Sequence, residues 1–499
     1  MHHKASHPNR KEIPLPGVAG YRMIGVTMNF RWALVWCLAL FGMDEPVAAA
    51  LGQLRAGAAV VDITPALGVA NGGVIARGGL VTHIHDELHA RCLVFDDGAT
   101  RLAIAICDMR MLGGEVVARA KSLAGKATGL APENILIAAT HTHAAPALVG
   151  IHPEPRDRAY AEFVARRIAD GITRAGHRLA SAKVGWGFGT APRHVHNRRW
   201  FMKLGAVAAN PFGGESDEVK MNPPRGIDLL EPAGPVDPQV SVLDVRHVDG
   251  RPLALLANYG LHYVGGYRAG HVSADYFGMF ADRVQELLKA DRQYPPFIAM
   301  MSNGTSGDVS NNDFRAKPER LPAWVKMQRV AADLAAEAVK VAGGISHHAA
   351  APLAVVATEL QLGVRRPDEA RLAWARRTLA NDPDPKRLTR PEIYAQEALA
   401  LAKFPAKVPV SLAAFRIGKL RIVTVPCEMF AETGLALKQE GGPGPLFIIE
   451  LANGYRGYLP TPRQHGWGGY ETWPARSSYL EEQAAPKIRA SLLDLLTKL

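Results

Sequence analysis

The sequence has few cysteines, no long apolar run and no concentrated charge, and each absence excludes a class of protein. Only four of the 499 residues are cysteine, and none of them form a CxxC pair. This excludes a disulfide-bonded scaffold and a cysteine-based zinc site. No segment reaches 18 uninterrupted apolar residues, the length expected of a transmembrane helix. The chain is therefore predicted to be a soluble globular protein.

The net charge of +11 is spread over the chain. It results from 58 basic and 47 acidic side chains, in short basic clusters separated by acidic and apolar residues. A basic protein can attract anionic partners, but nucleic-acid binding needs a basic stripe or run that this sequence lacks. The sequence thus predicts no nucleic-acid partner and allows at most a transient contact with a membrane surface.

Residues 1–50 have the order of a targeting segment. Polar and basic residues precede an apolar run of 12 residues at 32–43, and small residues follow at 47–50. This order is typical of a secretory signal peptide, and translation could begin at Met1 or at Met28. We predict a secreted or periplasmic protein whose mature domain spans 51–499.

The apolar patterns predict an α/β fold with mixed sheets. Strand 102–108, helix 115–128 and strand 134–140 make a βαβ unit, whose strands should be parallel. Cys92 and Cys107 lie in strand-like runs and are predicted to be core residues. Further patterns predict hairpins at 240–259 and 408–425, loops at 207–236 and 441–445, a helical insertion at 366–404 and a terminal helix at 478–498.

Two histidines directly follow a predicted strand. The run 134–140 leads into His141 and His143, a spacing at which a loop can direct one imidazole at a metal and hold the other beside it. Imidazole is the commonest zinc ligand. The alternative is a pair of surface histidines in a turn, because short motifs also occur by chance.

Three further predicted strands end close to possible ligands. The strands 253–259, 420–425 and 446–451 lead into His262, into Glu428 and into the pair Tyr455 and Tyr458, respectively. A sheet that gathers its carboxyl ends would bring these side chains together. Two histidines and one carboxylate are a common catalytic zinc set. Each residue alone has a plainer explanation, as a hydrogen-bonded histidine, a helix N-terminal carboxylate or a rim tyrosine.

Short motifs elsewhere complete an ordered pattern over roughly residues 57–473. They are Asp62-Ile63-Thr64-Pro65, His85-Asp86 with Ala90-Arg91, Asp108, Thr140-His141-Thr142-His143, Asn197-Arg198, Val236-Asp237-Pro238, Asn258 to His262, Gly307-Asp308-Val309-Ser310, Pro426-Cys427-Glu428, and Ala452-Asn453 through Tyr458 to Tyr470-Glu471. In this order they resemble the neutral/alkaline ceramidases, zinc amidases that split ceramide into sphingosine and a fatty acid.

The resemblance implies a ceramidase-like catalytic domain with Zn²⁺ held by His141, His262, Glu428 and Tyr458. Tyr458 is preferred to Tyr455 because a second functional tyrosine should follow 12 residues later, where Tyr470 stands.

The resemblance also implies functional residues around the metal. His143 would be the second, non-ligating histidine and Arg198 would face the substrate amide. Ser310 stands where a nucleophile has been discussed in the family, and we expect it to position substrate instead.

The chain departs from the family pattern at several places. Ala144-Ala145 replaces a Ser-Gly pair, and Arg199 stands where the family has serine. The chain ends about 30 residues after the last motif, so no C-terminal immunoglobulin-like domain is expected.

These features predict metal-assisted hydrolysis of an amide bond in an N-acyl compound, with a ceramide-like lipid as the leading substrate. His143 would transfer protons, and Tyr470 and Arg198 would stabilise the oxyanion. Asp108 and Asp308 would either orient the histidines or cap strand ends. The alternatives are a zinc amidase or esterase for a non-sphingolipid substrate, a non-catalytic zinc-binding protein, and a membrane-surface protein that uses its positive charge.

Overall fold

A computed structural model describes residues 53–72, 75, 79–149, 155–290, 295–380 and 387–499. The predicted signal peptide lies outside these residues. Within them, no helix combines the length and the apolar character needed to cross a membrane.

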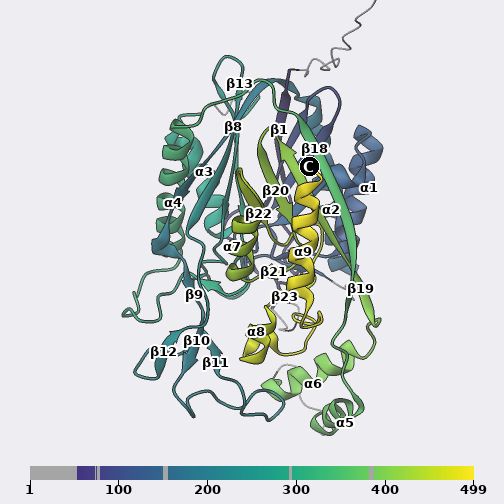
Figure 1. Cartoon of the computed structure of the whole chain (residues 1–499), viewed down its shortest axis with the longest axis vertical. Helices are drawn as coiled ribbons and strands as arrows, with labels where there is room; N and C mark the ends of the chain where they lie inside the picture. The colour runs from purple at the N-terminus through teal and green to yellow at the C-terminus, as the bar shows by residue number, and fades with distance from the viewer. Residues whose placement is uncertain (1–52, 73–74, 76–78, 150–154, 291–294, 381–386) are drawn as a thin grey trace, which may run out of the picture. The chain divides into compact units, whose positions relative to one another are not determined.

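The larger sheet has eight strands in the order β16-β14-β13-β8-β1-β3-β4-β6 (Figure 1). They are β1 (Arg55–Asp62), β3 (His89–Asp96), β4 (Arg101–Cys107), β6 (Ile135–Ala139), β8 (Ala180–Thr190), β13 (Gln239–His247), β14 (Pro252–Tyr259) and β16 (Ile298–Asn303). The pair β4/β6 is parallel and is joined by α1 (Gly114–Thr128), which confirms the predicted βαβ unit. β13 and β14 form the predicted antiparallel hairpin.

A second sheet of four strands packs against the first. Its order is β18 (Leu353–Gly363), β19 (Lys407–Ile417), β20 (Leu420–Thr424) and β22 (Leu446–Ile449). Inward side chains of both sheets share one core, in which Phe95 and Leu256 lie with Phe415 and Phe447. The predicted hairpin of β19 and β20 is confirmed, and β20 runs parallel to β22.

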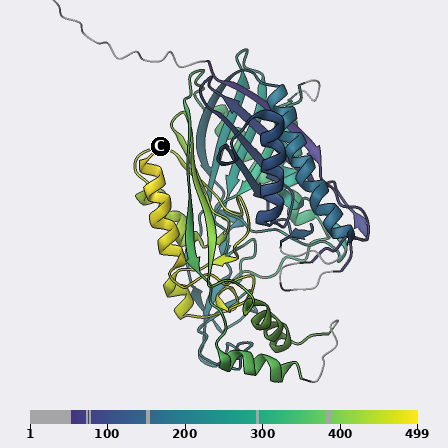
Figure 2. The same cartoon turned by 90° about the vertical axis from the view of Figure 1, so that its right-hand side faces the viewer.

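Helices cover the outer face of each sheet (Figure 2). On the eight-stranded sheet, α1 and α2 (Pro155–His177) bury one core, and α3 (Asp275–Leu287) and α4 (Val325–Gly343) bury another. On the four-stranded sheet, α7 (Ala431–Glu440) and α9 (Ala484–Thr497) close a fourth core. Cys92, Cys107 and Cys427 are buried and free, which confirms the core role predicted for Cys92 and Cys107.

Smaller elements surround the ends of the two sheets. They are β2 (His83–Ile84), β5 (Met111–Leu112), β7 (Ala147–Leu148), β9 (His196–Asn197), β10 (Arg199–Met202), β11 (Val219–Met221), β12 (Leu229–Pro232), β15 (His271–Val272), β17 (Val309–Ser310), β21 (Glu428–Met429), β23 (Tyr458–Leu459), α5 (Glu369–Thr378), α6 (Arg390–Leu401), α8 (Pro462–Gly466) and η3 (Tyr470–Thr472). Single 3-10 turns lie at Pro132–Asn134 and Pro192–His194.

Two sequence predictions are corrected. The segment 207–236 is not all loop, because β11 and β12 pair with opposite edges of β10, a tertiary pairing that local Gly and Pro content hides. The terminal helix begins at Ala484 rather than at Ser478. Before it, Ser478 and Leu480 form β-bridges to other segments, and their carbonyls accept hydrogen bonds from Arg365.

The apolar pattern did not predict β8, in which Gly185, Gly187 and Gly189 recur at every second position. A Cβ at Gly185 would lie 2.3 Å from Cγ2 of Ile345, and one at Gly189 would lie 2.4 Å from a carboxylate oxygen of Glu337. The alternation therefore lets α4 and the turn after it lie directly on the strand.

We expect Gly185→Ala to lower the free energy of unfolding by about 1–3 kcal/mol, the usual cost of overpacking. The new methyl group would also meet the backbone oxygen of Ser346 at 2.5 Å, so the turn has to shift. Chemical denaturation measures the effect. Gly343→Ala is the control, since nothing lies within 4 Å of its added Cβ. Equal stability of both variants would contradict the packing explanation.

Candidate metal centre

The carboxyl ends of parallel strands from both sheets converge on one site. His141 follows β6, His262 follows β14 and Glu428 follows β20. Each of these strands has a parallel neighbour in its sheet, and ligands gather where such strands end. The structure thus brings together the strand ends that the sequence analysis grouped.

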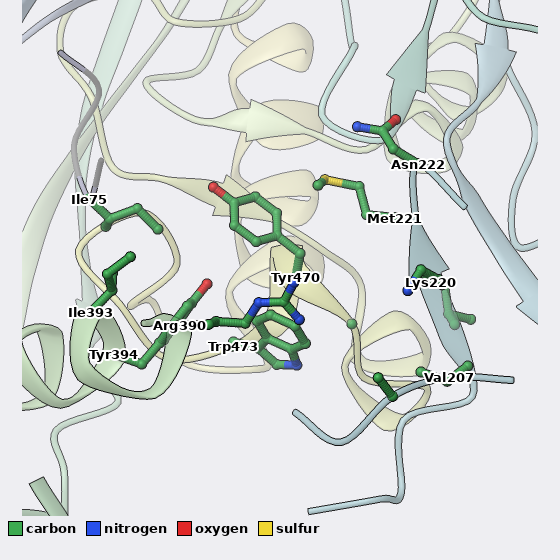
Figure 3. A pocket seen from close by; sticks show the side chains of 13 residues that line it. Ile75, Val207, Lys220, Met221, Asn222, Arg390, Ile393, Tyr394, Tyr470 and Trp473 are labelled. Atoms are coloured by element: carbon green, nitrogen blue, oxygen red, sulfur yellow. The ribbon is translucent and has the colours of Figure 1, made fainter. Parts of the chain in front are cut away.

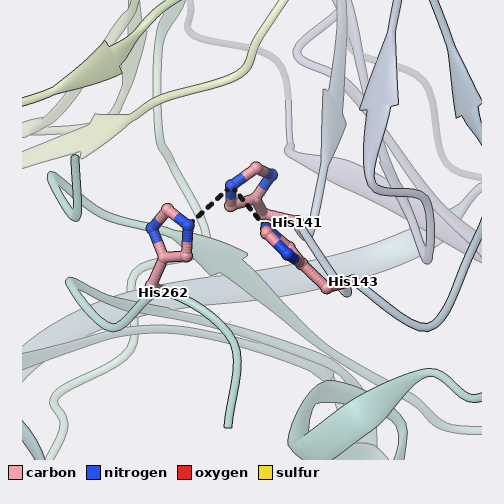
Figure 4. A group of neighbouring side chains, drawn as sticks. All are labelled: His141, His143 and His262. Atoms are coloured by element: carbon pink, nitrogen blue, oxygen red, sulfur yellow. Dashed lines mark hydrogen bonds between the residues drawn. The ribbon is translucent and has the colours of Figure 1, made fainter. Parts of the chain in front are cut away.

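Three imidazoles lie in contact at this point (Figure 4). Nε2 of His141 lies 3.0 Å from Nε2 of His262 and 3.3 Å from Nε2 of His143. His141 and His262 are buried, and His143 is half-buried. One ring nitrogen from each residue lies within 4.8 Å of the other two, so the three can serve one metal ion.

Backbone carbonyls fix how two of these rings are protonated. Nδ1 of His141 donates to the carbonyl of Arg110 at 2.8 Å, and Nδ1 of His262 donates to that of Ser306 at 3.2 Å. In a neutral imidazole, a proton on Nδ1 leaves a lone pair on Nε2. The two Nε2 atoms therefore face each other as electron-pair donors, an arrangement that a cation between them would stabilise.

Glu428 adds a negative charge to this pair. Its Oε2 lies 3.3 Å from Nε2 of His141 and 3.8 Å from Nε2 of His262. This oxygen is buried and accepts no hydrogen bond from any described residue, whereas Oε1 accepts one from Tyr455 at 2.9 Å. Ligand atoms around a tetrahedral zinc ion lie roughly 3.3 Å apart, as calculated from its bond lengths. The donor set and its spacing therefore fit zinc.

Burial and mutual charge favour the neutral form of the imidazoles. Burial, together with neighbouring His141, holds the pKa values of His143 and His262 well below the ordinary histidine range. Burial alone would raise the pKa of Glu428, but His141 and Arg198 hold it below its usual value. The site thus presents His143 and His262 as neutral imidazoles beside an ionised carboxylate, the forms that bind metals.

His143 differs from the other two histidines in its surroundings. Its ring stacks on Tyr263, with centroids 3.8 Å apart and planes 12° from parallel. Its carbonyl accepts a hydrogen bond from Arg110. The resemblance implied that His143 does not bind the metal. Its Nε2 nevertheless lies 3.3 Å from Nε2 of His141, which is the spacing expected between two ligands of one zinc ion. Both roles are therefore compatible with its position.

The two tyrosines that the sequence analysis compared both lie next to Glu428. The hydroxyl of Tyr455 donates to the Glu428 carboxylate. Tyr458 pairs in parallel register with Glu428, so the two side chains leave neighbouring strands on the same face. The Tyr458 ring lies 5.4 Å from the guanidinium carbon of Arg198 and 5.9 Å from the ring of Tyr470.

A buried ionic network borders the site. Glu471 accepts from Nε of Arg198 at 2.9 Å and from Nη1 of Arg199 at 2.7 Å. Another nitrogen of Arg198 lies 3.4 Å from Nε2 of His262. Burial lowers the pKa of Arg198, but Tyr458, Glu471 and Glu428 together raise it above its ordinary value. Arg198 is thus a fixed positive charge at the edge of the histidine cluster.

We expect Glu471→Gln to lower the free energy of unfolding by about 3–5 kcal/mol, because it leaves two buried guanidinium groups without their carboxylate. Chemical denaturation measures the loss. Glu440→Gln is the matched control, since Glu440 pairs with Arg489 on the surface, where a pair contributes about 0–1 kcal/mol. A loss for Glu471→Gln no larger than that of the control would contradict the prediction.

The other predicted site residues lie around this centre. Tyr470 begins η3 and is half-buried between Tyr458 and Trp473. Ser310 lies in β17, which pairs with β9 directly before Arg198. The hydroxyl of Ser310 accepts a hydrogen bond from the backbone N–H of Asn312 at 3.2 Å.

Asp108 and Asp308 do not orient the histidines. The carboxylate of Asp108 accepts from Arg91 and from the backbone N–H of His89. That of Asp308 accepts from Asn197 and from the N–H of Ala431, at the start of α7. The strand-end alternative therefore fits Asp108, which follows β4 and bonds the first N–H of β3, whereas Asp308 caps the start of helix α7. Backbone carbonyls orient the rings of His141 and His262 in place of either aspartate.

Several contributing features were not predicted from the sequence. The backbone of His141 has a φ of 74°, a strained conformation for a residue with a side chain. Ser306, whose carbonyl orients His262, also donates from its hydroxyl to the buried carboxylate of Glu450 at 2.6 Å. The signal for Glu450 was present, because an acidic residue directly ends the apolar strand β22. Nothing in the sequence pattern marked Tyr263 or the carbonyl of Arg110.

Comparisons with known proteins come from sequence and from structure. Residues 55–323, just over half of the chain, match the family model described as "Neutral/alkaline non-lysosomal ceramidase, N-terminal". A structure titled "Ceramidase complexed with C2" superposes with a TM-score of 0.65 at 17% identity, covering 89% of this chain and 75% of that one. The neutral ceramidase of Pseudomonas aeruginosa gives a TM-score of 0.64 at 18% identity, covering 89% and 74%. No curated protein sequence matches the chain.

Proposed function

Because the chain belongs to the neutral/alkaline non-lysosomal ceramidase family, we propose that it is a zinc-dependent hydrolase that cleaves the amide bond of an N-acyl lipid. A ceramide-like lipid is the leading substrate, as the family description suggests. The fold shared with solved ceramidases supports this proposal.

One observation carries the proposal. Nε2 of His141, Nε2 of His262 and Oε2 of Glu428 lie 3.0–3.8 Å apart in a buried site, and each has its other polar atom held by a separate partner. Histidine and carboxylate ligands are typical of catalytic zinc sites, and structural sites are usually rich in cysteine. This composition favours a hydrolase over a non-catalytic zinc-binding protein.

The chain's own residues suit the remaining steps of amide hydrolysis. A zinc ion held by His141, His262 and Glu428, with Tyr458 as the further ligand, would supply Lewis acidity. His143 is half-buried at the cluster and would take a proton from water and pass it to the leaving amine. Arg198, with its fixed positive charge, and Tyr470 would stabilise negative charge on the carbonyl oxygen. Ser310 would position the substrate.

A second candidate keeps this chemistry with another substrate, an N-acyl compound that is not a sphingolipid. It is favoured by the departures at Ala144-Ala145 and Arg199. Arg199 is fully buried in the Glu471 network, so the neighbourhood of Arg198 differs from what the family pattern predicts.

The test uses the purified mature chain, residues 51–499, with its zinc content measured. It is incubated with fluorescent ceramide and other N-acyl amides, with and without a chelator. Chelator-sensitive cleavage of ceramide supports both the mechanism and the leading substrate. Cleavage of other amides alone supports the second candidate. One zinc ion per chain without hydrolysis of any substrate would contradict both and favour a binding protein.

We also propose that the protein is exported, to the periplasm or outside the cell. Residues 1–50 lie outside the described residues, and their basic, apolar and small-residue order supports the proposal. Cell fractionation and N-terminal sequencing of the mature protein test it. A full-length chain retained in the cytoplasm would contradict it.

A further inference from the structure

A cavity of about 520 Å³ opens beside Tyr470 (Figure 3). Its wall comes mainly from β11, α6 and the segment around η3, and Ile75, Val207 and Ala208 complete it. Most of the lining is apolar and includes Val219, Ile393 and Trp473. An apolar cavity with a few polar groups, next to a catalytic centre, is the usual form of a substrate site.

Two cations and no acidic residue line this cavity in the described part of the chain. Lys220 extends from β11 and Arg390 from α6, on different sides of Tyr470 (Figure 3). Neither forms an ion pair with any described carboxylate. The guanidinium carbon of Arg390 lies 5.8 Å from the ring centroid of Trp473. Unpaired cations beside an apolar wall match an anionic amphiphile.

The position of Arg390 is fixed by the packing of its helix. α6 begins with a capping box between Thr389 and Glu392, and Arg390 is its first residue. Farther along the helix, the buried carboxylate of Glu397 accepts from Nη2 of Arg476 at 2.6 Å. The ring of Tyr394 lies 5.5 Å from that of Trp473. The segment 366–404, predicted as an insertion, therefore holds a cation at the cavity.

We propose that this cavity binds the anionic group of an N-acyl substrate, with Lys220 and Arg390 as its specificity residues. The substrate class is an N-acyl amino acid or a similar amide whose amine part carries a carboxylate. Water would cleave its C–N bond to give a fatty acid and the free amino acid. The inference rests on the proposed function for the cleavage step, and the binding step stands independently of it.

The test separates binding from cleavage. Zinc-depleted protein is titrated by calorimetry with N-dodecanoylglycine and N-dodecanoylethanolamine, which have the same acyl chain and differ in charge. We expect the anionic amide to bind about tenfold more tightly, and the preference to weaken as salt is added. The double variant Lys220→Met with Arg390→Gln should bind both amides equally, with the affinity for the neutral one unchanged.

The double variant Arg376→Gln with Arg377→Gln removes the same two positive charges from α5, outside the cavity lining, and should keep the preference. Equal binding of both amides by the unaltered protein, or a preference that survives in the double variant, would overturn the proposal. The zinc-loaded enzyme is then assayed with both amides. A binding preference without hydrolysis would leave the anion site in place and refute the hydrolase function.

Discussion

Replacing Glu428 with glutamine is expected to remove bound zinc and activity together. The amide keeps the shape of the side chain and can still accept the hydrogen bond from Tyr455, so only the charged oxygen beside His141 and His262 is lost. A residue that merely orients a ligand changes metal affinity by about 10–100-fold, and loss of a direct ligand should exceed this range. Metal analysis and kcat/KM, measured on the same preparation, should fall in parallel.

Glu440→Gln serves as the charge-matched control for this variant, because Glu440 is exposed at the end of α7. A thermal unfolding scan adds a readout that does not depend on activity. A ligand that binds only the folded state raises stability, so a chelator should lower the melting temperature of the unaltered protein and leave that of Glu428→Gln unchanged. Full zinc occupancy in Glu428→Gln would rule out Glu428 as a ligand.

Replacing His143 with asparagine is expected to lower kcat by about 10²–10⁴-fold, the usual contribution of a proton-transfer group, while one zinc ion per chain remains. The reason lies in the anchoring of the three rings. Carbonyls fix His141 and His262, and Glu428 lies beside both, whereas His143 is half-buried and stacked on Tyr263.

The same variant tests whether His143 is itself a zinc ligand. The distance of 3.3 Å between its Nε2 and that of His141 is compatible with this role. If His143→Asn loses as much zinc as is expected for Glu428→Gln, His143 is a ligand, and the proton-transfer role is left without a residue. His177→Asn, an exposed histidine on α2, is the control and should change neither zinc content nor kcat. Unchanged kcat in His143→Asn would contradict the acid–base assignment outright.

The elements that carry the site were predictable because their signals are local. An uninterrupted apolar run followed by a polar side chain predicts a buried strand and its end, and this held for β6, β14, β20 and β22. The βαβ unit and both hairpins followed from the same patterns and from short connections. β8 and β11 were not predicted. The alternating glycines of β8 and the pairing of β11 with an edge of β10 both depend on the segments that pack against these strands.

The orienting contacts of the site could not be predicted in the same way. The carbonyls that orient His141 and His262 belong to Arg110 and Ser306. Because every residue has a carbonyl, the sequence does not indicate which one accepts the N–H of each histidine ring. Asp108 and Asp308 looked suitable by residue type, yet they bond elsewhere. Hydrogen-bond partners depend on directions in space that residue identity does not specify.

The sequence by itself determined the α/β class, the strand ends that bear His141, His262 and Glu428, and the likeness to the ceramidases. Periodicity and motif order record these features directly. Only the tertiary structure decided that the two sheets bring these ends within 3.0–3.8 Å of one another. It also decided that α6 supplies Arg390 to the cavity beside Tyr470. The physical reason is that such contacts join residues 80 or more positions apart, whose meeting depends on how whole layers pack.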